Sequence, residues 1–188
     1  MKLARLSLVV LVLVSCRSTR PAGTPVAPIT AATAEDAMQQ LRARRASFDG
    51  ARSLMRVRAT TNGKTQSFRA QLAVHDAQRM ELVAYTPVGT TALTLKADGE
   101  RITSDPEVAP EAFAFLRASG VTPAEIAMLI LGLPPRDGLQ YEVEPGGLTR
   151  ASFGDVVVAF TPPAFPAQNV IVTRGNDRVE IEHLEVVH

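Results

Sequence analysis

Alternating apolar side chains, interrupted by short turn signals, most constrain what this chain can fold into. Apolar residues occupy every second position of four successive stretches. These residues are Met55, Val57 and Ala59, then Phe68, Ala70, Leu72 and Val74, then Met80, Leu82 and Ala84, and then Leu93, Leu95 and Ala97. Asn62-Gly63 lies between the first two stretches, and Asp98-Gly99 follows the fourth, before Arg101 and Ile102. Both dipeptides are typical of tight hairpin turns. The pattern predicts antiparallel strands that bury one face.

Further strand-like stretches follow in the C-terminal part of the sequence. They cover Gln140 to Glu144, Leu148 to Phe153, Val156 to Thr161, Asn169 to Arg174 and Arg178 to Val187. Glycine-containing turns separate most of these stretches, and a proline-rich link spans residues 162–166. We therefore expect a second group of antiparallel strands.

Three helices are expected beside the strands. Thr33 is a suitable N-cap for the first, which continues to Arg45, and the second covers residues 110–118. The third begins with a capping box of Thr122 and Glu125 and runs to Leu133, where two prolines end it. Strands, helices and strands again indicate an α+β fold with helices on one face of an antiparallel sheet.

The N-terminus has the pattern of an export signal. Residues 1–15 place two basic residues before a short apolar run, and that run is too short to span a bilayer. Cys16, the only cysteine, follows directly, so the chain cannot form an internal disulfide. We interpret Leu-Val-Ser-Cys as a bacterial lipobox in which Cys16 is lipidated. The alternative is an uncleaved signal with an incidental cysteine.

Three segments follow from this interpretation. Residues 1–15 are a signal peptide, residues 16–32 are a lipidated cysteine with a tether rich in Pro, Thr and Ala, and residues 33–188 are one domain. A fully extended tether could hold the domain about 50 Å from its anchor.

Removing residues 1–15 removes two basic residues and no acid, so the formal charge falls from +1 to −1. Such a balance gives no electrostatic case for binding nucleic acid.

Several segments, in order, resemble the LolB family of outer-membrane lipoprotein receptors. They are TPVGTTALTL at 86–95, IAMLILGLPP at 126–135 and PAFPAQNVIVTRGNDRVEIEHLEVV at 163–187, and with the lipobox they span nearly the whole chain. The resemblance implies a half-open antiparallel β-barrel with a lid of about three helices enclosing an apolar cavity. It also implies a monomer that accepts lipoproteins from a LolA-like periplasmic carrier and inserts them into the outer membrane.

The resemblance assigns roles to particular residues. Cys16 would carry the lipid anchor. In enterobacteria, a residue other than Asp after the lipidated cysteine directs a lipoprotein to the outer membrane, and here that residue is Arg17. The domain would then face the periplasm. Pro87, Val88 and Gly89 would form the membrane-insertion loop, in which the family places an exposed leucine. Without the resemblance, Val88 could fold back over Pro87 or Tyr85 as a minor part of the core.

The cavity that would shelter acyl chains of lipoproteins needs an apolar lining. Candidates come from the strands and from the third helix. They are Met55, Val57, Phe68, Leu72, Leu82, Leu93, Leu95, Ile126, Leu129, Ile130 and Leu133. Each could instead be ordinary core, and as a set they line a cavity only if helices and sheet do not close tightly.

No pattern in the sequence indicates an enzyme. Nucleophile-elbow, zinc-protease and phosphate-loop motifs are missing, and the three histidines have no metal-ligand spacing. His183 lies among alternating residues, where a solvent-facing or hydrogen-bonded imidazole is expected. We therefore expect no catalytic residue, no metal and no cofactor. The alternative to a transport receptor is a structural or scaffolding envelope lipoprotein with the same fold and a filled core, which docks on another envelope protein or binds another lipid.

Overall fold

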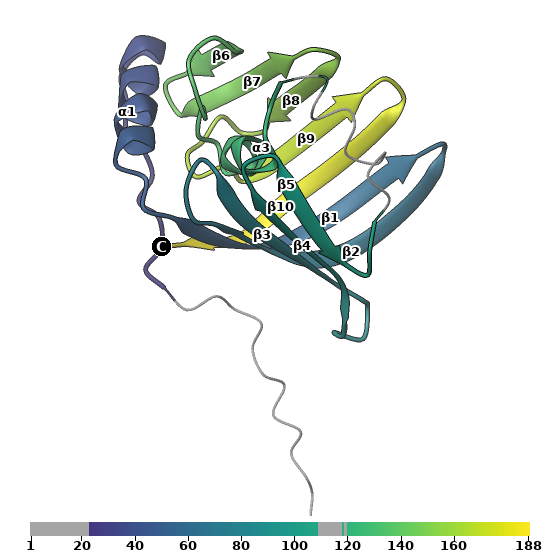
Figure 1. The fold of residues 1–188 in the computed structure, drawn as a ribbon. Helices are drawn as coiled ribbons and strands as arrows, with labels where there is room; N and C mark the ends of the chain where they lie inside the picture. The colour runs from purple at the N-terminus through teal and green to yellow at the C-terminus, as the bar shows by residue number, and fades with distance from the viewer. Residues whose placement is uncertain (1–22, 109–117, 119) are drawn as a thin grey trace, which may run out of the picture.

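The computed structural model describes residues 23–108, 118 and 120–188, and their strands form a single curved antiparallel sheet (Figure 1). In space the ten strands lie in the order β5-β4-β3-β2-β1-β10-β9-β8-β7-β6. Their bounds are β1 Ala51–Thr61, β2 Lys64–Val74, β3 Arg79–Tyr85, β4 Thr91–Asp98, β5 Arg101–Asp105, β6 Gln140–Glu144, β7 Gly147–Phe153, β8 Val156–Phe160, β9 Asn169–Arg174 and β10 Asp177–Val187. The sheet is open between β5 and β6, as expected for a half-open barrel.

The hairpins form where the turn chemistry predicts them. Asn62 and Gly63 both have positive φ angles, 51° and 74°, which two-residue hairpin turns favour because they match the strand twist. The register places Val57 opposite Phe68 and Ala70 opposite Ala84, so the apolar residues of neighbouring strands share one face. The predicted antiparallel strands are confirmed, and those of the C-terminal part agree within a residue or two.

Two helices lie in the described residues. In α1, Ala34–Ala46, the Thr33 side chain accepts a hydrogen bond from the Asp36 amide, which confirms the predicted N-cap. In α3, Pro123–Ile130, the capping box is also confirmed. However, α3 ends before the predicted Leu133, because Gly132 adopts a φ of 92° and turns the chain out of the helix. The helix predicted at residues 110–118 lies almost entirely outside the described residues.

The two helices occupy different places. Figure 1 shows α3 inside the concave side of the sheet, where it contacts β2, β3 and β4. By contrast α1 lies beside β6 and β7, which it contacts, so it does not cover the sheet as part of the predicted lid. Neither helix of the described ranges is long and apolar enough to cross a membrane. The architecture is mostly β, with one described helix filling the interior.

Part of the predicted tether is docked on the domain. Pro25 forms a β-bridge with Val187, and the Val26 amide donates to the Val186 carbonyl at 3.1 Å. Val26 and Ile29 are buried, with 7% and 8% of their surface exposed. Residues 25–29, which the sequence assigns to the tether, are therefore packed on the domain. The apolar residues of this stretch add to the core, which a composition rich in Pro and Ala does not reveal.

Candidate functional site

Val88 is the most exposed large apolar side chain of the described residues, with 86% of its surface accessible. It lies in the turn between β3 and β4. The Gly89 amide donates to the Thr86 carbonyl at 2.9 Å, which closes a four-residue turn with Pro87 and Val88 at its centre. Gly89 then takes a φ of 87°, a conformation that strains other residues. Val88 does not fold back as core.

Two threonines hold this turn in place. The hydroxyls of Thr86 and Thr90 lie 2.7 Å apart, and the Thr90 amide donates to the Thr86 hydroxyl at 3.2 Å. The Thr86 amide also donates to the Thr90 carbonyl at 2.8 Å. The turn is thus a braced hairpin end that presents a branched apolar group to solvent.

The residues predicted to line a cavity fall into two groups. Met55, Val57, Leu72, Leu129 and Leu133 are buried members of the hydrophobic core, with 7% or less of their surface exposed. The others are half-buried, and all but one of them pack against that core. This second group consists of Phe68, Leu82, Leu93, Leu95, Ile126 and Ile130. These half-buried residues keep part of their apolar surface exposed.

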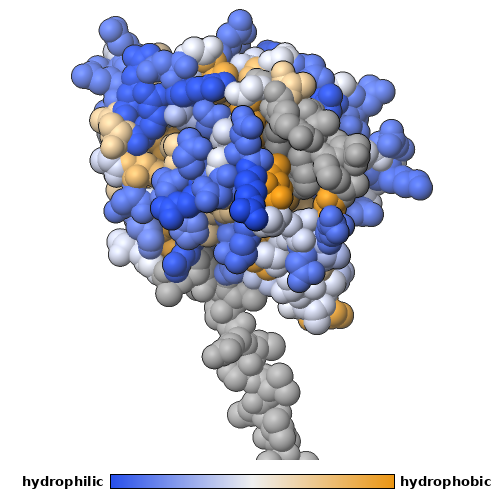
Figure 2. All heavy atoms as spheres, viewed as in Figure 1, coloured by the Kyte–Doolittle hydropathy of each residue, from blue (hydrophilic) through white to orange (hydrophobic). Residues whose placement is uncertain are grey.

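Burial falls off along the inner face toward the hairpin turns. On β2, Val74, Leu72 and Ala70 are buried, while Phe68 is half-buried. On β4, Ala97 is buried, while Leu93 is half-buried. Because Tyr85 pairs with Arg69, the end of the sheet near Phe68 is also the end that carries Val88. Figure 2 shows hydrophobic residues at the surface of a face that is otherwise mostly hydrophilic. The open part of the inner face and the exposed valine therefore lie toward the same end.

A separate cavity of about 250 Å³ lies at the opposite end of the sheet. Val26 of the docked segment, Phe48 after α1 and Phe165 line it, together with Leu133 of the predicted set. Arg44, Asp49 and His188 give its lining a mixed polar character. This cavity does not coincide with the predicted acyl-chain cavity.

His183 connects the sheet to α3. Its Nδ1 lies 2.6 Å from the Ser53 hydroxyl, and its Nε2 lies 3.0 Å from the carbonyl oxygen of Ile130, the last residue of α3. The carbonyl can only accept, so Nε2 carries the proton and the Ser53 hydroxyl donates to Nδ1. Burial lowers the pKa of His183 to about 4, against the opposing effect of the bond to Ile130. The imidazole is a neutral structural link.

This link explains two polar residues on an apolar face. Ser53 has no exposed surface, so its hydroxyl cannot reach a substrate and serves packing instead. The alternation of apolar side chains along β1 and β10 places Ser53 and His183 on the inward face. However, nothing in the sequence shows that the two residues contact each other. No group of three or more His, Cys, Asp or Glu in the described ranges could hold a metal ion. Cys16 lies outside the described residues.

Comparison with known proteins places the fold. A family model described as a protein of unknown function, DUF3261, matches residues 53–131, less than half of the chain. A LolA superfamily protein from Nitrosomonas europaea aligns over 84% of this chain and 94% of its own, with a TM-score of 0.50 and 8% identity. A DUF1329 family protein from Desulfovibrio piger aligns over 81% and 92%, with a TM-score of 0.50 and 11% identity. No curated protein matches the sequence. The domain therefore has a LolA-like fold.

Proposed function

We propose that this protein is a lipid-anchored receptor of the LolB type, which takes lipoproteins from a LolA-like periplasmic carrier and inserts them into the outer membrane. The anchor would be Cys16, and the domain would face the periplasm. The observation that carries the proposal is Val88, which stands 86% exposed on a braced turn. The turn holds Val88 away from the core, at the position where the resemblance to the LolB family places a membrane-inserting leucine, and this position supports contact with a membrane.

The inner face supplies the second half of the proposal. A lipoprotein in transit must hide its acyl chains from water, and each buried methylene stabilises the complex by about 0.8 kcal/mol. The half-buried residues between β2, β4 and α3 offer apolar surface, and the LolA-like fold supports this use of it. Transfer by this route needs apolar contact and no catalytic group.

The alternative is a scaffolding envelope lipoprotein with the same fold. It is favoured by the five predicted lining residues that are buried in the core, because a filled interior leaves less room for acyl chains. In that case Val88 would contact another envelope protein or another lipid. The two functions differ in whether the domain accepts an acylated cargo at all.

Transfer of a radiolabelled lipoprotein from its soluble carrier to liposomes tests the proposal. The chain should begin at Arg17, so that the docked residues are kept. We expect wild type to accept and deliver cargo, and Val88→Glu to accept cargo but deliver little, since a charge at the tip opposes membrane insertion. Val88→Leu should deliver at least as well, because it adds one methylene.

Asn176→Glu is the matched control. Asn176 is exposed in the turn between β9 and β10, and the pairing of Arg178 with Thr60 places this turn at the same end of the sheet. The control adds the same charge at a tip without an apolar side chain, so delivery should be unchanged. If wild type never accepts cargo, the receptor function is wrong and the scaffold becomes the better explanation.

A further inference from the structure

The β1–β2 hairpin carries positive charge without any acid. Residues 51–74 contain five basic residues and no Asp or Glu, in a chain whose formal net charge is only +1. Four of these residues are exposed arginines that point away from the apolar face. They are Arg52, Arg56, Arg58 and Arg69, here called the arginine face.

The register makes this arrangement unfavourable for the isolated domain. Arg56 lies directly opposite Arg69, and like charges in that position repel. Glu182 of β10 pairs with Arg56, but Arg52, Arg58 and Arg69 form no ion pair within the described residues. Two acids on neighbouring strands, Glu180 and Glu81, pair with Arg178 and Lys96. The arginine face thus retains unneutralised charge.

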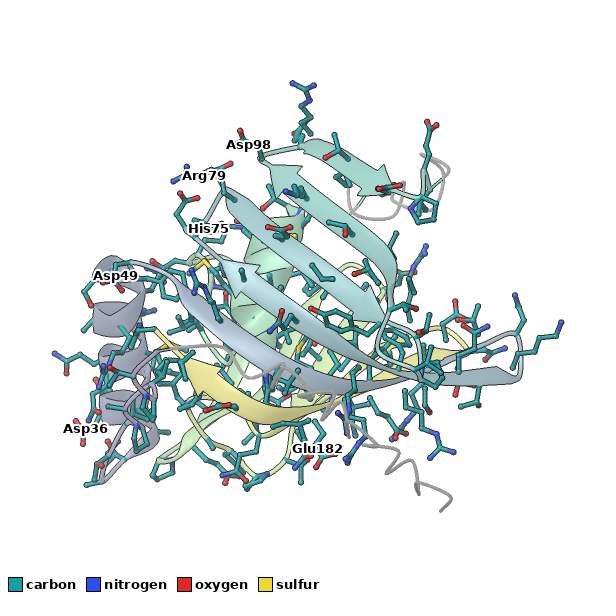
Figure 3. All side chains as sticks on the ribbon, turned by 90° about the horizontal axis from the view of Figure 1, so that it is seen from below. Asp36, Asp49, His75, Arg79, Asp98 and Glu182 are labelled. Atoms are coloured by element: carbon teal, nitrogen blue, oxygen red, sulfur yellow. The ribbon has the colours of Figure 1, made fainter. Side chains whose placement is uncertain are left out.

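The position of the arginine face in the domain indicates which partner neutralises its positive charge. In Figure 1 the beginning of the described chain and the turn between β3 and β4 both lie on the lower side of the domain, with the outer face of the sheet between them. Figure 3 looks onto that outer face, with α3 behind the strands and Glu182 labelled beside β10. Under the proposed function, the beginning of the described chain leads to the lipid anchor, and the turn between β3 and β4 enters the membrane.

Shallow grooves border the arginines on both sides. One of about 350 Å³ lies beside Arg52, between His75, Glu81 and Val83. Another of about 350 Å³ lies beside Arg56 and Arg58 and is lined by β9 and β10, including Glu180 and Glu182, which are each already paired with an arginine. Guanidinium groups bind phosphate oxygens in a bidentate manner, so grooves of this kind suit phosphate-bearing headgroups.

We propose that the arginine face binds the anionic phosphate headgroups of the membrane that holds the anchor. The inference rests on the proposed function, because the two membrane attachments define which face is turned toward the lipid. It adds a third contact that orients the domain, with the outer face of β1 and β2 against the headgroups.

Vesicle flotation tests the proposal with the chain from Arg17 on, without lipid anchor or cargo. We expect binding to vesicles that contain phosphatidylglycerol, weak binding to phosphatidylcholine alone, and loss of binding at high salt. Each basic side chain at an anionic surface contributes a factor of about five, so Arg58→Gln with Arg69→Gln should bind about 25-fold more weakly. Arg58→Lys with Arg69→Lys keeps the charge and should retain most of the binding.

Arg101→Gln with Arg150→Gln is the matched control, since both arginines are exposed on other strands and the net charge changes equally. This control should bind as wild type does. Equal binding to neutral and anionic vesicles, or full binding by the Arg58 and Arg69 double variant, would overturn the proposal. Because no cargo is present, such a result leaves the transfer experiment as a separate test of the receptor function.

Discussion

His183 is the residue whose ionisation should govern stability in mild acid. The folded protein keeps its imidazole neutral down to a pKa of about 4, while the unfolded chain takes up the proton near 6.5. The free energy of unfolding should therefore be highest above pH 6.5 and fall by about 3 kcal/mol between pH 6.5 and pH 4. Urea unfolding at a series of pH values measures this directly.

His183→Gln provides the control, because it removes the titrating group and keeps a side chain that can donate and accept. Its unfolding free energy should be nearly flat over the same interval. The backbone amide of Gln78 and the side chain of Arg79 hold the carboxyl pKa of Asp76 below its usual range, and the side chains of Arg45 and Arg42 do the same for Asp137. Their contribution is lost at lower pH, as the carboxyls take up protons. An equal slope in the variant would show that another group is responsible.

At the scale of elements, the docked stretch from Thr24 to Thr30 should behave as part of the domain. A chain that begins at Ala31 loses the buried side chains of Val26 and Ile29 and their backbone hydrogen bonds to β10 and Phe165. Burial of each such side chain contributes about 1.5–3 kcal/mol, so the chain that begins at Ala31 should be less stable. Urea unfolding of chains starting at Arg17 and Ala31 measures the difference.

Single substitutions separate burial from chain length. In the longer chain, Val26→Ala and Ile29→Ala should each reproduce part of the loss, whereas Thr24→Ala should be neutral because its side chain is exposed. Equal stability of the two chains would mean that the segment is held too weakly to matter. The tether would then have the full length that its composition suggests.

Across the whole molecule, what the sequence predicts depends on how local the cause is. Hairpins and caps follow from neighbouring residues, so Asn62-Gly63, Thr33 and the Thr122 capping box are found where expected. The link from Ser53 to His183 joins residues 130 apart, and docking of Val26 depends on an edge that β9 leaves open. Such contacts have no local signal. The exposed Val88 needed the resemblance, because a turn valine is otherwise ambiguous.

Whether the interior takes up acyl chains is the last question at this scale, and two adjacent residues can answer it. Leu82 and Val83 are both half-buried on β3, but Leu82 faces α3 and the core while Val83 borders the outer groove. Titration with a fluorescent fatty acid should show binding to wild type. Leu82→Asn should weaken it roughly tenfold or more, because a leucine contact is worth about 1.5 kcal/mol or more. Val83→Asn should bind normally, since its side chain is on the other face.

If wild type binds no fatty acid, the interior is closed to lipid and the scaffold function gains support. If both variants weaken binding equally, the fatty acid does not distinguish the inner from the outer face of β3, and the proposal of an inner site is wrong.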